Sequence, residues 1–166
     1  MGIACDVSGS MRAYTAHVAS AAWILAHAAH HTRIPATTAT IAFGSGVHAI
    51  THPGSAPAVV TEFAARDCYE DIPTAIDALD GALGLAHPGA ARLLVIVSDG
   101  HYDPHARRDG QHRLDRLRAN GCGVLWLATN AANEPLQGAF VHQLNDPATT
   151  ARAIGRAATA ALRAAR

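Results

Sequence analysis

The chain has 166 residues, 49% of them hydrophobic, which is enough length and apolar material for one domain with a substantial core. Its 13 basic residues, all of them arginine, balance 13 Asp and Glu, so charge gives no reason to expect nucleic acid or an anionic membrane as the main partner. No basic segment followed by an apolar run opens the chain, and no stretch approaches the roughly 20 apolar residues of a membrane span.

The first 25 residues predict a strand followed by a helix. Residues 3–7, Ile-Ala-Cys-Asp-Val, form a short apolar run that ends in a polar loop. Apolar residues then recur every three or four positions between Tyr14 and Leu25, which is the spacing of a helix. Because the strand begins almost at residue 1, we expect one domain, residues 1–166, cut from a longer chain.

A hairpin is predicted next. Residues 38–43 are rich in Thr, Ile and Phe and stop at the turn Gly44-Ser45-Gly46, after which an apolar segment restarts at 47–50. Residues 59–63 follow several Pro and Gly breaks. They either form one more short strand or lie across the edge of the sheet.

The second half of the chain alternates helices and strands. Apolar residues at intervals of three and four predict a helix from Ile72 to Leu83, and the aliphatic run 93–97 predicts a central strand covered on both faces. Asp109 is predicted to cap the next helix, and residues 123–127 to form another buried strand. Asp146 with Pro147 is predicted to open a last amphipathic helix.

This alternation predicts an α/β fold. We expect a doubly wound, mostly parallel six-stranded sheet with one antiparallel edge strand, right-handed crossovers and helices on both faces.

Polar residues gather where the predicted strands end. Asp6, Ser8 and Ser10 leave the first strand, Asp99 leaves the central aliphatic strand, and Glu70 precedes a helix. Ligands of open α/β sheets bind outside the carboxyl ends of the strands, so these residues are expected at one edge. Carboxylates and hydroxyls are hard oxygen ligands, which favour Mg²⁺, Mn²⁺ or Ca²⁺ over zinc. The sequence therefore predicts a divalent-cation site.

Two segments carry a resemblance to a known family. Asp-Val-Ser-Gly-Ser-Met after the first strand and Val-Ile-Val-Ser-Asp-Gly later are similar to the metal-ion-dependent adhesion site of von Willebrand factor A domains, and the similarity covers nearly the whole chain. The resemblance implies that Ser8 and Ser10 bind the ion through their hydroxyls, while Asp6 and Asp99 hold it directly or through water. One coordination position is then left for an acidic side chain of a partner protein. Bacterial intracellular members of the family imply an AAA+ ATPase or another subunit of a larger assembly as that partner.

One loop departs from the family pattern. The family usually has Thr in a Gly-Gly-Thr-Asp-like loop, whereas residues 67–72 here read Asp-Cys-Tyr-Glu-Asp-Ile and put Glu70 in the place of that Thr. Glu70 is expected to bind the ion itself, where it adds a third negative charge to Asp6 and Asp99. The same carboxylate could instead fill the position that a partner needs. Thr74 is a poorer substitute because it falls inside the predicted helix.

Two other functions stay open. A metal-assisted hydrolase would use the same ion with His101 or His105 as acid or base. A metal-free scaffold would keep Asp6, Ser8 and Asp99 only as caps and loop ties. No Walker A or Rossmann glycine motif is present to support nucleotide binding.

The cysteines, tryptophans and paired histidines have ordinary structural interpretations. Three widely spaced cysteines without a CxxC pair indicate neither a disulfide framework nor a zinc knuckle, and fit a reducing cytoplasm. His27 and His31 have helical metal-pair spacing but no third ligand, so a solvated helix end is expected. Four side chains are expected to be buried: Cys5, Cys122, Trp23 and Trp126. The Cys68 side chain is expected to be accessible.

Overall fold

A computed structural model describes residues 1–31, 36–60, 63–65, 67–129, 134–144, 152–153, 155–157, 159–160 and 163. The elements in chain order are β1 (Gly2–Asp6), the 3-10 helix η1 (Gly9–Tyr14), α1 (Thr15–His30), β2 (Ala39–Phe43), β3 (Val47–Thr51), α2 (Ile72–Leu83), β4 (Leu93–Ser98), α3 (Pro104–Ala119), β5 (Gly123–Ala128) and β6 (Phe140–Gln143).

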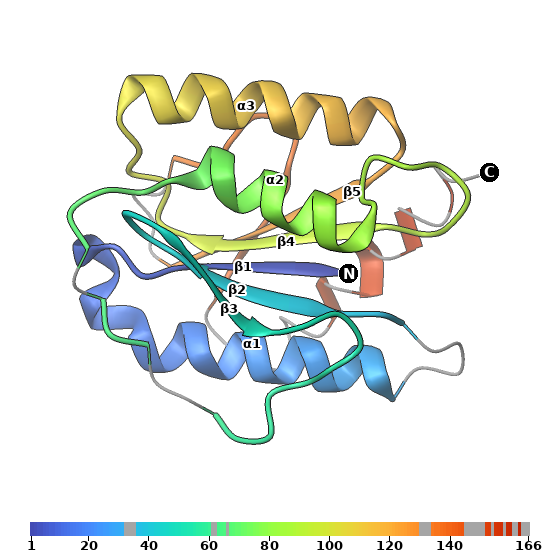
Figure 1. Cartoon of the computed structure of the whole chain (residues 1–166), viewed down its shortest axis with the longest axis horizontal. Helices are drawn as coiled ribbons and strands as arrows, with labels where there is room; N and C mark the ends of the chain where they lie inside the picture. The colour runs from blue at the N-terminus through green and yellow to red at the C-terminus, as the bar shows by residue number, and fades with distance from the viewer. Residues whose placement is uncertain are drawn as a thin grey trace.

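The strands form one sheet in the order β3-β2-β1-β4-β5-β6 (Figure 1). All neighbouring pairs are parallel except β2 and β3, which form the predicted antiparallel hairpin at one edge. The predicted fold class is therefore confirmed. Strands are added first on one side of β1 and then on the other, so the topological switch point lies between β1 and β4, where sheets of this type bind ligands.

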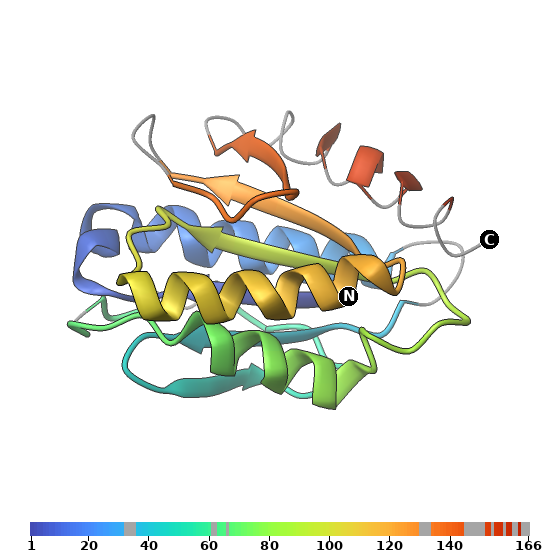
Figure 2. The same ribbon diagram turned by 90° about the horizontal axis from the view of Figure 1, so that it is seen from above.

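Each face of the sheet has its own apolar core, because successive side chains of a strand point to opposite faces. In β4, Leu94 and Ile96 join the core beneath α2 and α3, whereas Val95 and Val97 join the core beneath α1. Figures 1 and 2 show the helices on opposite sides of the sheet. Six consecutive buried residues in β4 explain why this strand was the clearest in the sequence.

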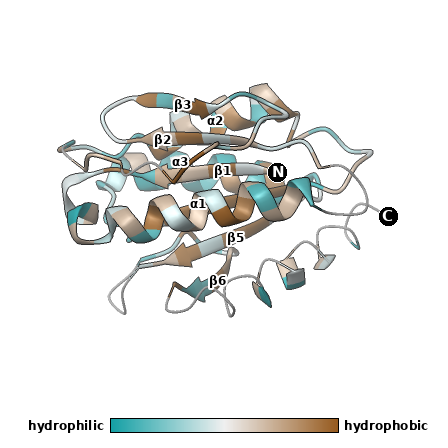
Figure 3. Cartoon of the chain, turned by 90° about the horizontal axis from the view of Figure 1, so that it is seen from below, coloured by the Kyte–Doolittle hydropathy of each residue, from teal (hydrophilic) through white to brown (hydrophobic). Residues whose placement is uncertain are grey.

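The face beneath α1 is also covered by part of the C-terminal segment. Figure 3 views this face, with hydrophobic and hydrophilic bands along α1. Ala157 belongs to the same core, and Figures 2 and 3 place the C-terminal segment on the β6 side of the domain. The described residues between 152 and 163 are helical, whereas Asp146 and Pro147, the predicted start of this helix, lie outside the described residues.

The two helices on the other face have strong N-terminal caps. The Asp71 carboxylate accepts from the Thr74 backbone N–H at 3.2 Å, so the acidic residues before α2 do mark its start. The prediction for the start of α3 was wrong by six residues. Asp103 caps this helix by accepting from two backbone N–H groups, with Pro104 at the first helical position, and Asp109 lies within the helix.

Three further expectations needed correction or completion. Val59 and Val60 are exposed and form no strand, and the next two residues lie outside the described part of the chain. The sixth strand is instead β6, which the sequence did not predict. Trp126 is fully buried, but Trp23 is partly exposed, and its ring lies tilted by 34° against that of His27 with ring centroids 4.1 Å apart. No helix in the described portion combines the length and apolar character needed to cross a membrane.

Candidate metal centre

The candidate site lies where β1 and β4 end side by side. Cys5 pairs with Val97 in the parallel register, so Asp6 and Ser98 come next on adjacent strands. Both strands run to the same edge of the sheet, on the left in Figure 1. The loop that precedes α2 reaches this edge as well, because the Asp71 backbone N–H donates to the Gly44 carbonyl at 2.7 Å. The fold therefore brings the three predicted polar clusters together.

Asp6 is held in a defined orientation by two hydrogen bonds. One carboxylate oxygen accepts from the Ser8 backbone N–H at 2.9 Å, and the other accepts from the Ser98 hydroxyl at 2.5 Å. Only 1% of the residue is exposed. Burial raises the pKa of Asp6 most strongly and the negative charge of Asp99 raises it further, while the bonds from Ser98 and Ser8 oppose both effects.

Ser98 is the centre of a buried network that the sequence analysis missed. Besides donating to Asp6, its hydroxyl oxygen accepts from the Tyr102 hydroxyl and the Gly100 backbone N–H, both at 2.9 Å. Burial raises the pKa of Tyr102 well above its usual value, so this hydroxyl stays a donor. The Tyr102 ring packs edge-on against Trp126, with centroids 6.1 Å apart. No residue pattern announces this link, because Ser98 ends β4 and Tyr102 lies in the loop that follows.

The two serines of the first loop differ in exposure. Ser8 is fully buried and Ser10 is exposed, with their hydroxyl oxygens 3.1 Å apart. Asp67, which the sequence did not single out, fixes the loop. Its backbone carbonyl accepts from the Gly9 N–H at 2.7 Å, and its carboxylate accepts from the Ser45 N–H at 3.0 Å. The hydroxyls are thus presented by a loop that is tied to two neighbouring segments.

Asp99 is the second buried carboxylate, with 1% exposed. One of its oxygens accepts from the His101 backbone N–H at 3.1 Å, and the other lies 3.4 Å from the imidazole Nδ1 of the same residue. The loop turns at Gly100, whose φ of 76° is the left-handed region that glycine adopts without strain. His105 points elsewhere and lies 3.5 Å from Asp109, outside this group of side chains.

Glu70 approaches the same group from the loop before α2. It is partly buried, and its pKa is raised first by burial and then by the negative charges of Asp6 and Asp99, while a polar contact with the Ser8 side chain opposes these effects. Thr74 is exposed and lies inside α2, as expected.

The donor set fits a hard divalent cation. Asp6 and Glu70 have no ion pair with any described residue, and Asp99 has only the neighbouring imidazole. The charge of Asp99 raises the pKa of Asp6, and the charges of Asp6 and Asp99 raise the pKa of Glu70, so a positive ion near these carboxylates would stabilise their charged forms. Among the described residues, no three His, Cys, Asp or Glu side chains form a compact metal-binding group by themselves. The serine hydroxyls and water must therefore complete any coordination sphere.

The cysteines are placed as the sequence predicted. Cys5 and Cys122 are buried and Cys68 is exposed. Burial raises the pKa of Cys5 far above its usual value and that of Cys122 to about 11, so both remain neutral thiols at physiological pH.

Comparisons with solved structures identify the same fold. The manganese-loaded TRAP protein of Plasmodium vivax matches with a TM-score of 0.74 and 13% identity, over 95% of this chain and 72% of that one. A von Willebrand factor type A protein of Catenulispora acidiphila gives 0.66 and 19%, over 96% and 42%. Proximal thread matrix protein 1 from mussel byssus, with a zinc-occupied MIDAS motif, gives 0.59 and 13%, over 97% and 47%. The chain thus spans less than half the length of the last two.

No curated protein matches the sequence. The family described as "VWA domain containing CoxE-like protein" matches residues 3–164, which is nearly the whole chain. The chain belongs to this family of von Willebrand factor A domains.

Proposed function

We propose that this domain is a metal-dependent protein-interaction module. A divalent cation, Mg²⁺ or alternatively Mn²⁺ or Ca²⁺, is held by Asp6, Ser8, Ser10, Glu70 and Asp99, and it bridges to an acidic side chain of a partner protein. The observation that carries the proposal is the placement of two almost fully buried carboxylates, Asp6 and Asp99, at neighbouring strand ends, where neither is paired with any arginine that the structure describes.

The ion supplies the positive charge that these buried carboxylates lack. Ser98 holds one oxygen of Asp6, and the Ser8 backbone holds the other, so the carboxylate keeps its orientation whether or not a ligand is present. Ser10 is exposed at the rim of the site, where a partner can approach. This arrangement supports an ion that the buried side chains of the domain bind on one side and that a partner protein can contact from the solvent side.

The family and its structural relatives support this choice of chemistry. One relative is manganese-loaded and another has a zinc-occupied MIDAS motif. Because both are only 13% identical to this chain, they support a divalent ion in general and not a particular one. The choice of ion therefore rests on the donor atoms of the site. Oxygen donors favour Mg²⁺, Mn²⁺ or Ca²⁺.

The partner we propose is a cytoplasmic protein that presents an Asp or Glu, such as an AAA+ ATPase or another subunit of a larger assembly. The zero net charge of the chain agrees with a protein partner better than with nucleic acid or an anionic membrane surface.

Thermal unfolding tests the metal site directly. The protein is treated with EDTA and then titrated with Mg²⁺, Mn²⁺ and Ca²⁺. We expect saturable stabilisation, because a ligand that binds only the folded state raises its stability. Ser10→Ala removes one hydroxyl from an exposed position, and Ser45→Ala is its matched control at the same edge of the sheet.

The two variants give the test its direction. Ser10→Ala should need a higher metal concentration for the same shift, and Ser45→Ala should follow the wild type. If millimolar concentrations of all three ions leave the wild-type midpoint unchanged, the domain is a metal-free scaffold in which Asp6, Ser8 and Asp99 tie loops together.

A second candidate function is metal-assisted hydrolysis. It is favoured by one observation, the 3.4 Å separation between the His101 imidazole Nδ1 and the Asp99 carboxylate, which places a possible proton acceptor beside the site. His101→Ala separates the two functions, because it should abolish turnover of a hydrolysable substrate but leave metal-dependent stabilisation intact.

A further inference from the structure

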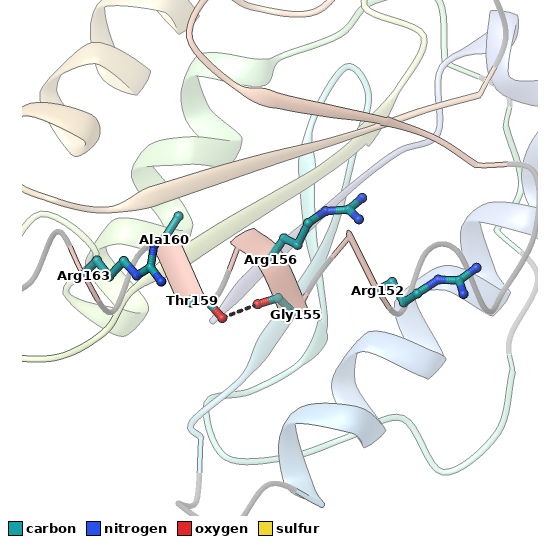
Figure 4. A pocket seen from close by; sticks show the side chains of 6 residues that line it. All are labelled: Arg152, Gly155, Arg156, Thr159, Ala160 and Arg163. Atoms are coloured by element: carbon teal, nitrogen blue, oxygen red, sulfur yellow. Dashed lines mark hydrogen bonds between the residues drawn. The ribbon is translucent and has the colours of Figure 1, made fainter.

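The C-terminal segment presents a row of arginines. Arg152, Arg156 and Arg163 are exposed and line an open hollow together with Gly155, Thr159 and Ala160 (Figure 4). Separations of four and eleven residues from Arg152 are those that place side chains on one side of an α-helix, about 6 Å and 16 Å along its axis, and the described residues of this segment are helical. Ala153 and Ala157 are buried, so the opposite side of the segment packs against the domain.

These arginines lack acidic partners within the described part of the chain. Arginines on α3 show the contrast. Arg113 and Arg116 form ion pairs with Asp77 of α2 at 2.6 and 3.3 Å. The last 20 residues of the sequence contain four arginines and no Asp or Glu, so this stretch has a net positive charge in a chain that is neutral as a whole. An acidic ligand would neutralise this charge without breaking a described ion pair.

Exposed apolar side chains adjoin the arginines. β6 is the edge strand of the sheet, and its Phe140 and Val141 are each 46% exposed. The Arg156 guanidinium lies 5.8 Å from the centre of the Phe140 ring, within the range of a cation–π contact. Aromatic and arginine side chains together are typical of protein interfaces and of their energetically dominant residues.

We propose that Phe140, Val141, Arg152, Arg156 and Arg163, the arginine face, form a docking surface for an acidic segment of a partner protein that also carries an apolar side chain. Carboxylates spaced one helical turn apart match Arg152 and Arg156, and an apolar residue beside them covers Phe140. The surface is separate from the metal centre, and it does not depend on the proposed function.

The observations favour a protein over the other polyanions. Of the described residues in this segment, the apolar Ala153 and Ala157 are buried in the domain, so they are not available to insert into a bilayer. Phe140 and Val141 are apolar groups that a phosphate backbone would leave uncovered.

Fluorescence anisotropy in EDTA tests the surface without the metal site. The probe is a labelled, Ala-based helical peptide with Glu at positions i, i+4 and i+11 and a Leu beside them, and the same peptide with Gln is the reference. Arg152→Glu/Arg156→Glu reverses the arginine face. Arg12→Glu/Arg108→Glu makes the same charge change at two exposed arginines elsewhere. Circular dichroism checks that each variant is folded.

We expect the Glu peptide to bind better than the Gln peptide and to bind more weakly as salt rises. Reversal of the arginine face should weaken binding roughly tenfold, since two weak exposed attractions become repulsions, whereas the control should change it less than about twofold. Equal binding of the two peptides, or an equal loss in the control, would refute the proposal. It is also wrong if the peptide fails while phosphatidylserine vesicles or an oligonucleotide bind through Arg152 and Arg156.

Discussion

Substitution of Ser98 by Ala should be the most damaging small change at the site. The side chain is fully buried, and its hydroxyl makes three hydrogen bonds, one donated to Asp6 and two accepted from Tyr102 and the Gly100 backbone. Alanine fills almost the same volume, so little of the effect comes from packing. Ser98→Ala therefore measures the network alone.

The magnitude follows from the partners that are left behind. A buried polar group that loses its partner costs about 1–3 kcal/mol, and more when it is charged. Three groups lose a partner here, and partial relaxation reduces the sum, so we expect a loss of about 3 kcal/mol. For a domain of this size that corresponds to a midpoint lower by roughly 6–12 °C. The loss should be present in EDTA, because it does not require a bound ion.

Urea unfolding in EDTA at neutral pH gives the free energy of unfolding of Ser98→Ala, with the exposed Ser45→Ala as control, expected within about 0.5 kcal/mol of wild type. Tyr102→Phe should lose less than Ser98→Ala, because it removes one of the three bonds. A loss below about 1 kcal/mol for Ser98→Ala would show that the network does not hold Asp6 in place.

Three further changes test other parts of the structure. Arg92 is buried, and its guanidinium donates to three backbone carbonyls; Arg92→Met should lower stability by about 2–4 kcal/mol in urea unfolding, since those acceptors lose charged donors. Gly100→Ala should lower it by at least about 2 kcal/mol, because φ is 76° and the new Cβ would lie 2.3 Å from the Glu134 carbonyl oxygen; normal stability of this variant would contradict the described loop. Burial and then the charge of Arg156 lower the pKa of His142 from 6.5. The unfolded chain then binds the proton more readily, so the stability from this group is complete above pH 6.5 and is lost as pH falls toward the folded-state pKa. Between pH 7.5 and 5.5, the free energy of unfolding of His142→Gln should fall less than that of the wild type. Equal decreases in the two proteins would exclude this contribution.

The sequence predicted the elements whose periodicity is strong. The aliphatic run of β4 and the Gly-Ser-Gly turn before β3 are local signals that the tertiary structure does not override. β6 has four residues, two of them exposed, and therefore has no apolar pattern that separates it from a loop. The start of α3 was misplaced because Asp103-Pro104 is an equally good cap and the residues after it are mostly polar.

The site divides in the same way. Asp6, Ser8, Ser10 and Asp99 could be expected at one edge from the sequence, because Asp6 ends a buried strand and the others follow one, and topology alone brings strand ends together. Asp67 acts through a backbone bridge to a loop far away in the sequence, which no residue pattern announces. Contacts of that kind depend on how segments cross in space.

Glu70 is the residue at which the candidate metal centre differs from the pattern that the family resemblance implies, because that pattern has Thr at this position. With Thr in its place the proposed site would offer two carboxylates to an ion, whereas with Glu70 it offers three. The negative charges of Asp6 and Asp99 raise the pKa of Glu70, so these carboxylates repel one another when no cation is bound. Glu70→Gln keeps the shape and removes one charge. In EDTA this variant should be at least as stable as the wild type, because repulsion and the burial of a charge are both relieved.

Affinity should move in the opposite direction. Loss of one carboxylate lowers the affinity of oxygen-ligand sites, so Glu70→Gln should bind Mn²⁺ on the order of tenfold more weakly in a calorimetric titration. The Asp109→Asn variant removes one charge from α3, away from the candidate ligands, and should bind as the wild type does. If Glu70→Gln binds as tightly as the wild type, Glu70 is not a ligand, and its carboxylate is positioned only to shape the rim. If it binds more weakly but is also less stable in EDTA, the loss reflects the fold of the loop rather than the charge at the ion.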